Sequence, residues 1–263
     1  MTRFRGLIFD MDGVLFAGER VFPGAPACVA GLRRQGMRVA FLTNNSGRHR
    51  REHCAKLRRL GFGADESEIV SSASVTAQHL RRKPNAETKR VYVIGGSGLA
   101  EEIQEAGLHL SDGSPPIDFV VVGMDVDFTY EKLTIAQHAI LNGAEFIATN
   151  ADPIFPTEDG PRPGGGTIVA AVQTAAQRPP DIVVGKPQTF GIEMILEQWR
   201  LPTRECALIG DQLATDIRAG NRAGLTTIMV TTGIDSAEDA RAAPADQRPD
   251  HVIKTLAELP DVL

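Results

Sequence analysis

Short apolar runs alternate with longer amphipathic stretches along the whole chain. The runs that we expect to form strands are Gly6–Asp10, Arg38–Thr43, Val91–Gly95, Phe119–Gly123, Glu145–Thr149, Ala207–Gly210 and Thr226–Val230. Helical stretches between short apolar strands are typical of βαβ units and of a parallel sheet covered on both faces. The pattern therefore predicts the α/β fold class.

One helix can be delimited from the sequence alone. Residues 25–35 repeat their apolar positions at helical spacing, and Gly36 follows directly. Glycine readily adopts the left-handed conformation in which many helices end. We expect a helix over residues 25–35, followed almost at once by the strand that begins at Arg38.

Two stretches read as linkers between domains. Residues 81–88 are polar or turn-forming, and residues 178–181 contain two consecutive prolines. About a hundred residues lie between them, with a βαβ pattern of their own, which is enough for a compact domain. We predict a core domain formed by residues 1–82 and 182–263, and an inserted domain formed by residues 83–181.

Composition excludes several classes of protein. The chain has 263 residues, 42% of them apolar, and a formal net charge of −5. No apolar run approaches the roughly 18 residues of a membrane span, and the charged N-terminal segment does not read as a secretory signal. A basic face for nucleic acid is not indicated by the net charge. We expect a cytoplasmic protein that binds neither membrane nor nucleic acid.

The three cysteines have neither the number nor the spacing of a disulfide framework or a zinc site. They are Cys28, Cys54 and Cys206, and reduced thiols are expected. The one locally basic stretch runs from Arg48 to Arg59. Its spacing favours a solvated helix face over a specific anion site.

The first group of residues with chemical potential follows the first strand. Asp10 and Asp12 come at its carboxyl end, where parallel sheets build their sites, and Gly13 provides a turn. The turn would give the two carboxylates different surroundings and different pKa values, so one could attack while the other carries protons. A turn with two solvated aspartates is the alternative reading of the same pattern.

The second strand ends in hydroxyl and amide groups. Thr43, the side chain of Asn44 and the amides that precede the next helix could bind phosphate oxygens, with Asn45 in the same group. Ordinary helix capping by Asn45 or Ser46 is the alternative.

Two later strands add a cation and further carboxylates. Lys186 follows Val183, Val184 and Gly185, so its ammonium is held near a strand end and could bridge a carboxylate and a phosphoryl group. Asp211 ends the strand Ala207–Gly210, and Asp216 follows one helical turn later. Asp10 and Asp211 would suffice for Mg²⁺, which binds oxygen ligands and keeps several waters.

Together, four strand ends supply every part of a phosphoryl-transfer site: a nucleophile, a proton carrier, donors to phosphate oxygens, a cation and a metal ligand. The order and spacing of Asp10-x-Asp12-Gly13-Val14, Thr43-Asn44, Gly185-Lys186-Pro187 and Gly210-Asp211 to Asp216 closely resemble the four motifs of the haloacid dehalogenase superfamily. The resemblance covers essentially the whole chain.

The resemblance implies a Rossmann-like core and a Mg²⁺-dependent phosphatase. It implies an aspartyl-phosphate at Asp10, with Mg²⁺ held by the Asp10 side chain, the Asp12 carbonyl and Asp211. In that scheme Asp12 protonates the leaving oxygen and later activates water. From its position one helical turn after Asp211, Asp216 is expected to have a supporting role, in which it orients Lys186 or a metal-bound water.

Spacing indicates the subclass. Only 33 positions separate Asp10 from Thr43, whereas 143 separate Thr43 from Lys186, so a large insert fits only in the second gap. With Pro23-Gly24-Ala25 and Ala148-Thr149-Asn150-Ala151-Asp152, the chain resembles the NagD or p-nitrophenylphosphatase-like subfamily IIA, which has an α/β type II cap domain. Gln212 departs from the asparagine frequent in related phosphatases.

The cap is expected to close over the site and to choose the substrate. Asn150, Asp152 and the turn Pro163–Gly166 are the candidates for specificity, although such glycines are more often simple turns. Residues Gly95–Gly98 lack the third glycine of a dinucleotide fingerprint, so a tight turn is expected there.

The expected substrate is a small phosphorylated metabolite such as a nucleotide or sugar phosphate. Two alternatives use the same fold: a phosphotransferase or mutase that passes the phosphoryl group to another acceptor, and a non-catalytic phosphate-binding protein. A dehalogenase is less expected, because its reaction has no leaving oxygen for Asp12 to protonate. The sequence leaves the oligomeric state open, a homodimer included.

Overall fold

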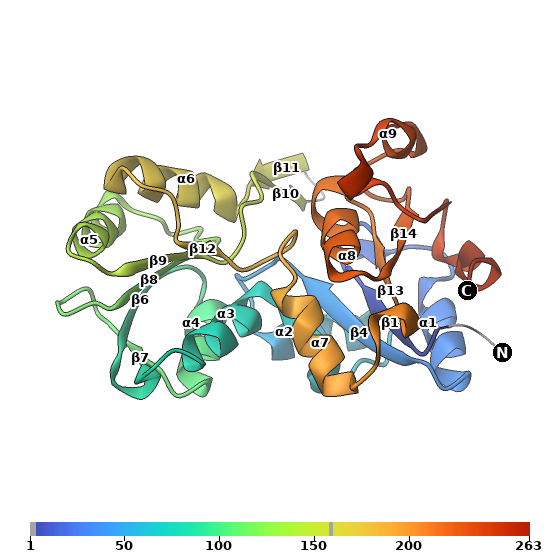
Figure 1. Ribbon diagram of the computed structural model, residues 1–263, viewed down its shortest axis with the longest axis horizontal. Coiled ribbons are helices and arrows are strands. Elements are labelled where there is room, and N and C mark those ends of the chain that lie inside the picture. Colours follow the sequence, from blue (N-terminus) through green and yellow to red (C-terminus); the bar gives the residue numbers. More distant parts are fainter. Residues whose placement is uncertain (1–3, 158–159) are drawn as a thin grey trace.

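A computed structural model of the protein describes residues 4–157 and 160–263. Figure 1 shows two lobes, each built on a parallel sheet with helices on both faces. The first sheet has the strand order β15-β14-β13-β1-β4-β5, and the second has the order β12-β9-β8-β6-β7. The predicted α/β class is confirmed.

The first sheet is assembled from both ends of the chain. Its strands are β1 (Gly6–Phe9), β4 (Arg38–Thr43), β5 (Ile69–Ser71), β13 (Cys206–Gly210), β14 (Thr226–Val230) and β15 (His251–Ile253). Every residue of β1 and β13 is buried, which explains why these strands are apolar on both faces. The helices α1 (Ala25–Arg34) and α2 (Arg50–Arg59) cover one face, and α3 (Ser72–Arg81), α7 (Phe190–Trp199) and α8 (Arg218–Ala223) cover the other.

The second sheet is formed by the middle of the chain. Its strands are β6 (Arg90–Ile94), β7 (His109–Leu110), β8 (Phe119–Val122), β9 (Glu145–Ala148) and β12 (Ile182–Val183). The helix α4 (Ser97–Glu105) packs on one face, while α5 (Tyr130–Leu141) and α6 (Gly165–Ala176) pack on the other. β12 lies just beyond residue 181 yet pairs with β9. We propose residues 83–181 as the inserted domain, with β12 added to its sheet from the segment that follows.

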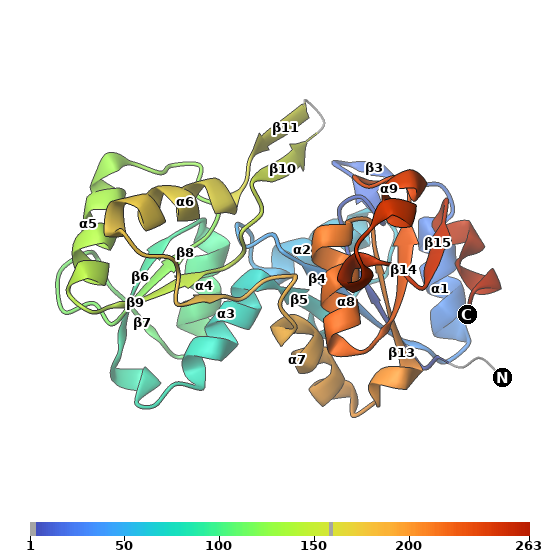
Figure 2. The same ribbon diagram turned by 45° about the horizontal axis from the view of Figure 1, so that its top comes forward.

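Two hairpins and several short turns complete the part of the chain that the structure describes. The hairpins are β2 (Phe16–Ala17) with β3 (Arg20–Val21), and β10 (Ile154–Thr157) with β11 (Gly160–Pro163). Figure 2 shows β10 and β11 leaving the second lobe and reaching toward the first. The helix α9 (Ala237–Ala242) and the π-helical turn η4 (Leu213–Ile217) follow β14 and β13, respectively. In the described ranges, no helix is long and apolar enough to cross a membrane.

The predicted elements are present, and where their ends differ from the prediction they do so by one residue. The helix over residues 25–35 is α1, and Gly36 after it has a φ of 81°. Asp10, Gly95 and Gly123 lie just past the strands in which they were predicted, because the chain turns there into loops. The three cysteines are free thiols.

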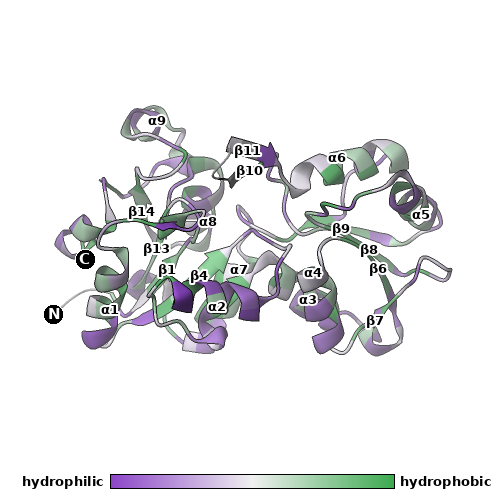
Figure 3. Cartoon of the chain, turned by 180° about the vertical axis from the view of Figure 1, so that it is seen from behind, coloured by the Kyte–Doolittle hydropathy of each residue, from purple (hydrophilic) through white to green (hydrophobic). Residues whose placement is uncertain are grey.

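The basic stretch of α2 differs in part from its prediction. Figure 3 shows α2 as hydrophilic on the outside of the molecule, and the side chains of Arg58 and Arg59 are 59% exposed. Arg50 and Arg51, however, form ion pairs with Glu105 of α4. The start of this helix is therefore a contact between the two lobes and not a free solvated face, which short-range spacing cannot reveal.

Candidate active site

A cavity of about 960 Å³ lies between the two lobes, at the carboxyl end of the first sheet. The predicted residues that line it are Asp10, Asp12, Thr43, Asn44, Asn45, Lys186 and Asp211. Asp10 follows β1, Thr43 ends β4 and Asp211 follows β13. The structure thus brings together residues that are up to 201 positions apart in the chain (211 − 10).

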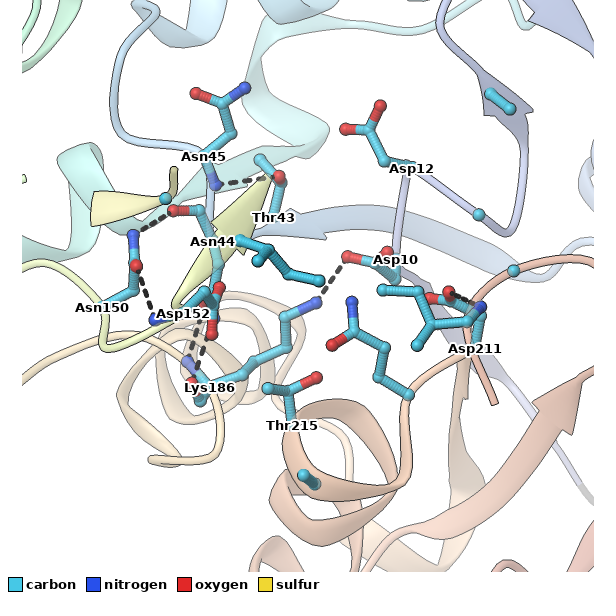
Figure 4. A pocket seen from close by; sticks show the side chains of 18 of the residues that line it. Asp10, Asp12, Thr43, Asn44, Asn45, Asn150, Asp152, Lys186, Asp211 and Thr215 are labelled. Carbon is cyan, nitrogen blue, oxygen red and sulfur yellow. Dashed lines mark hydrogen bonds and ion pairs between the residues drawn. The ribbon is translucent and has the colours of Figure 1, made fainter. Parts of the chain in front are cut away.

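Lys186 is the central cation of this cavity (Figure 4). Its Nζ donates hydrogen bonds to Oδ1 of Asp10 and, over 2.5 Å, to Oδ1 of Asp216. Its side chain is only 5% exposed, and burial alone would lower its pKa, but the two carboxylates raise that pKa well above the usual value. Lys186 is therefore a permanently charged ammonium that neutralises the carboxylates on either side of it.

Asp10 and Asp211 both lie in surroundings that disfavour their negative charge. Burial raises the pKa of Asp10 well above its ordinary value, with Lys186 opposing this and Asp216 and Asp211 adding to it. Burial and the neighbouring Asp216 raise the pKa of Asp211 to about 7. An added positive charge would stabilise the ionised form of both groups.

The donor set fits a hard divalent cation. Carboxylate oxygens of Asp10, Asp211 and Asp216 lie within 4.8 Å of one another. Oδ2 of Asp211 accepts a hydrogen bond of 2.9 Å from the amide of Ile234, whereas its buried Oδ1 has no hydrogen-bond partner among residues 4–157 and 160–263. A buried oxygen without a partner is costly, and a cation at this point would satisfy it.

Asp12 lies in different surroundings from Asp10, as the predicted turn requires. Gly13 has a φ of 84°, and its amide donates to the carbonyl of Phe16, so the chain leaves the strand direction directly after Asp12. The Asp12 side chain lines the cavity and is partly buried. Burial raises its pKa, although Lys56, Arg48 and Lys186 lower it. A carboxyl group with a raised pKa is better suited to donate a proton to a leaving oxygen.

Thr43 offers a hydroxyl to the cavity. Its Oγ1 accepts a hydrogen bond of 3.1 Å from the amide of Asn45, so the hydroxyl hydrogen can be directed at a ligand oxygen. The side-chain oxygen of Asn45 accepts from the amide of Gly47 over 3.0 Å, which shapes the loop before α2.

The side chain of Asn44 lines the cavity and is hydrogen-bonded within the protein. Its Oδ1 accepts a hydrogen bond from the amide of Lys186 over 2.8 Å, and its Nδ2 donates both to the carbonyl of Lys186 over 3.0 Å and to Oδ2 of Asp152 over 2.9 Å. Both amide hydrogens are thus used within the protein. A contact between this side chain and phosphate would have to replace one of these bonds, and it stays a prediction. A strand end alone does not show which partner an amide group binds.

The turn η4 positions Asp216. The amides of Asp216 and Ile217 both bond to the carbonyl of Gln212, which forms the wide π-helical turn. Oδ2 of Asp216 accepts from the amide of Gln212 over 3.2 Å, and Oδ1 accepts from Lys186. Such turns are frequent at functional sites. Asp216 therefore contacts Lys186, and its predicted role in orienting this lysine stays a prediction. Gln212 itself lines the cavity.

The loop after β14 was missed as part of this site. Thr232, Gly233, Ile234 and Asp235 all line the cavity, and Asp235 accepts a hydrogen bond of 2.6 Å from the amide of Leu213 in η4. The strand Thr226–Val230 was predicted, and its end lies at the same sheet edge as Asp211. The polar run Thr231-Thr232-Gly233 after it is the signal that could have identified this loop.

The second lobe contributes a further part of the cavity lining. Asn150 and Asp152 line it from the loop after β9, and Gly164 and Gly165 line it from the start of α6. Of the segment Gly95–Gly98, Gly95 and Gly96 connect β6 to α4, and Ser97 and Gly98 begin α4, where Gly98 packs against the backbone of Arg48 and His49.

Comparison with known proteins places this site in a family. The profile of the family "Haloacid dehalogenase-like hydrolase" matches residues 7–109, and the profile of an HAD-hydrolase-like family matches residues 183–259. Chronophin of Mus musculus is 39% identical over 97% of this chain and 91% of its own.

Two solved structures have the same fold over nearly the whole chain. The 4-nitrophenylphosphatase of Thermotoga maritima has a TM-score of 0.92 and 33% identity, over 98% of this chain and 97% of its own. The glycerol phosphate phosphatase of Mycobacterium tuberculosis, in complex with magnesium, has a TM-score of 0.92 and 34% identity, over 98% of this chain and 76% of its own. The chain therefore belongs to the haloacid dehalogenase superfamily, within its NagD-like, capped phosphatases.

Proposed function

We propose that this protein is a Mg²⁺-dependent phosphatase that hydrolyses small phosphate monoesters through an aspartyl-phosphate on Asp10. The single observation that supports this most is the contact of one buried ammonium, that of Lys186, with Asp10 and Asp216 beside the unpartnered oxygen of Asp211. The two solved structures of similar proteins carry phosphatase names, which agrees with it.

In the first step, a carboxylate oxygen of Asp10 attacks phosphorus, and the bond from phosphorus to the ester oxygen breaks. Asp12 donates its proton to the leaving oxygen, for which the raised pKa of Asp12 suits it. Lys186 stays charged throughout and reduces the repulsion between Asp10 and the phosphoryl oxygens. Thr43 donates its hydroxyl hydrogen to one of these oxygens.

In the second step, Asp12 takes a proton from water, the water oxygen attacks phosphorus, and the bond to Asp10 breaks. Bound Mg²⁺, held by Asp10, Asp211 and the carbonyl of Asp12, would supply positive charge to the transferring group. Asp216 keeps Lys186 in place, and Asp211 is kept in place by the amide of Ile234.

Phosphate release tests this proposal directly. Wild type is assayed with p-nitrophenyl phosphate and a panel of metabolite phosphates, with Mg²⁺ and with a chelator. Asp10→Asn should lose activity by about 10³-fold or more, because the nucleophile is removed. Asp65→Asn, an exposed aspartate with a side chain 68% accessible, is the matched control. Equal rates for wild type and Asp10→Asn would overturn the covalent mechanism, and phosphorylated acceptor in place of free phosphate would indicate a transferase.

A further inference from the structure

Lys186 reaches Asp10 from a backbone that is held by both lobes. The strand that leads to it is bonded to the second sheet: Val184 donates to the carbonyl of Ala148 over 2.9 Å, and Gly185 donates to that of Thr149 over 2.8 Å. From the other side, the Asn44 side chain binds the amide and the carbonyl of Lys186 itself. The lysine thus stands at the junction of the two lobes.

The two-point contact of Asn44 restricts the lysine peptide strongly. The planar side-chain amide of Asn44 accepts a hydrogen bond from the backbone nitrogen of Lys186 over 2.8 Å. It also donates one to the carbonyl oxygen of the same residue over 3.0 Å. Two such bonds fix orientation as well as position, as bidentate contacts do. Lys186 is 5% exposed, so few waters could replace these bonds if they were lost.

Asn44 is held in turn by the loop after β9. Oδ2 of Asp152 accepts from Nδ2 of Asn44 over 2.9 Å, and Nδ2 of Asn150 donates to the carbonyl of Asn44 over 2.8 Å. Oδ1 of Asn150 accepts from the amide of Asp152 over 3.1 Å, so these two residues act as one unit. Figure 4 shows Asn150, Asp152 and Asn44 side by side next to Lys186.

We propose that Asn44, together with Asn150 and Asp152, is a positioning device for Lys186, through which the second lobe sets the distance between the lysine ammonium and Asp10. The inference rests on the proposed function, since it assigns Lys186 a role in that reaction. It gives Asn44 no contact with substrate. Asp152 acts through Asn44, and neither is a catalytic residue.

A donor–acceptor exchange tests the proposal. Asn44→Asp keeps the acceptor for the amide of Lys186 but removes both donors and places a carboxylate against that of Asp152. We expect kcat to fall at least about 10-fold, as for loss of a buried hydrogen bond to a charged group. Asp152→Asn is the second single variant of the cycle, and we expect a smaller loss of kcat than in Asn44→Asp, because its side-chain oxygen still accepts from Asn44.

The double variant N44D/D152N restores a donor between positions 44 and 152. We expect it to recover at least about 5-fold of the lost kcat, a non-additivity that measures the coupling. A side chain at position 44 that binds phosphate would give no recovery, because the donor to phosphate would still be missing. All rates are measured at 20 °C on variants shown by circular dichroism to be fully folded, so a purely structural role would leave kcat unchanged.

Asn142→Asp provides the control for an added carboxylate, since Asn142 is exposed at the end of α5. The inference is overturned if Asn44→Asp retains the wild-type kcat, or if D152N does not rescue it. The proposed function fails separately, by absence of Mg²⁺-dependent hydrolysis in wild type. Failure of one is therefore not mistaken for failure of the other.

Discussion

Gly233 lies directly against the carboxylate of Asp211. A Cβ atom added to Gly233 would overlap Oδ2, Cγ and Cβ of the Asp211 side chain. The next amide in this loop, that of Ile234, donates to the same Oδ2 over 2.9 Å. The loop after β14 therefore sets the orientation of a predicted metal ligand through contact at short range.

Gly233→Ala should weaken Mg²⁺ binding. The added methyl group must displace the Asp211 carboxylate or the loop, and loss of support for a metal ligand typically lowers metal affinity by about 10-fold to 100-fold. We expect a higher Mg²⁺ concentration for half-maximal hydrolysis, measured by Mg²⁺ titration of the activity. Gly31→Ala is the control: it lies within α1, and a Cβ there meets only the end of Arg34 at 3.7 Å. Unchanged Mg²⁺ dependence in Gly233→Ala would contradict this account.

Mg²⁺ should stabilise the fold more at pH 8 than at pH 6. Burial and Asp216 raise the pKa of Asp211 from 3.8 to about 7, so the metal-free folded state holds this proton more tightly than the unfolded chain does. The metal-free protein thus loses stability as pH rises from 3.8 to about 7, and the ionised carboxylate of Asp211 becomes available to Mg²⁺.

The measurement is the melting temperature with Mg²⁺ and with a chelator at both pH values. At about 100 times the dissociation constant, binding stabilises by about 2.7 kcal/mol. Asp211→Asn should reduce the Mg²⁺ increment and remove its pH dependence. Equal increments at pH 6 and pH 8 in wild type would count against this reasoning.

His53 should make the protein less stable in mild acid. Burial lowers its pKa from 6.5 to about 4, with Arg48 and Lys56 adding to this and the Asn45 backbone opposing it, and its Nε2 has no hydrogen-bond partner in the described part of the chain. Between these values the unfolded chain binds the proton and the folded protein does not, so stability is lost as pH falls from 6.5 to 4. The loss amounts to about 3 kcal/mol.

Urea unfolding of wild type and His53→Leu at several pH values checks this. The difference in unfolding free energy between pH 7 and pH 4 should be smaller in His53→Leu, whatever its stability at pH 7. His109→Leu, at an exposed position, should keep the wild-type dependence. The same slope in His53→Leu and wild type would refute the assignment.

Gly98→Ala should destabilise the protein. A Cβ at Gly98 would overlap the backbone of Arg48 and His49, and a backbone cannot move aside as a flexible side chain can. The overlap would push α4 from the start of α2, where Glu102 accepts from the amide of Arg50 over 3.0 Å. We expect a loss of about 2 to 3 kcal/mol, the upper range for overpacking, in chemical denaturation. A loss no larger than that of Gly31→Ala would contradict the close packing.

The sequence was sufficient to predict which strand ends meet. Asp10, Thr43 and Asp211 each follow or end an apolar run, and parallel strands bring their carboxyl ends to one edge. The strands β5 and β15 were not predicted, because three residues are too few for a periodic pattern.

The partner of a polar side chain was beyond prediction. The bond between Asn44 and Asp152 joins residues 108 positions apart and depends on how the two lobes pack. The contact of Arg51 with Glu105, across 54 positions, arises in the same way. Residue type and spacing show where an amide or guanidinium lies along an element, but a tertiary contact decides what it binds.

One apolar cluster contains side chains from both sheets. Ile8 and Leu208 of the first sheet belong to it, as do Val121 and Ile147 of the second. Because the two sheets share this buried cluster, unfolding of one lobe would expose apolar side chains of the other, so the lobes should melt cooperatively. A calorimetric trace with a single peak, instead of two resolved ones, is the thermodynamic signature to expect.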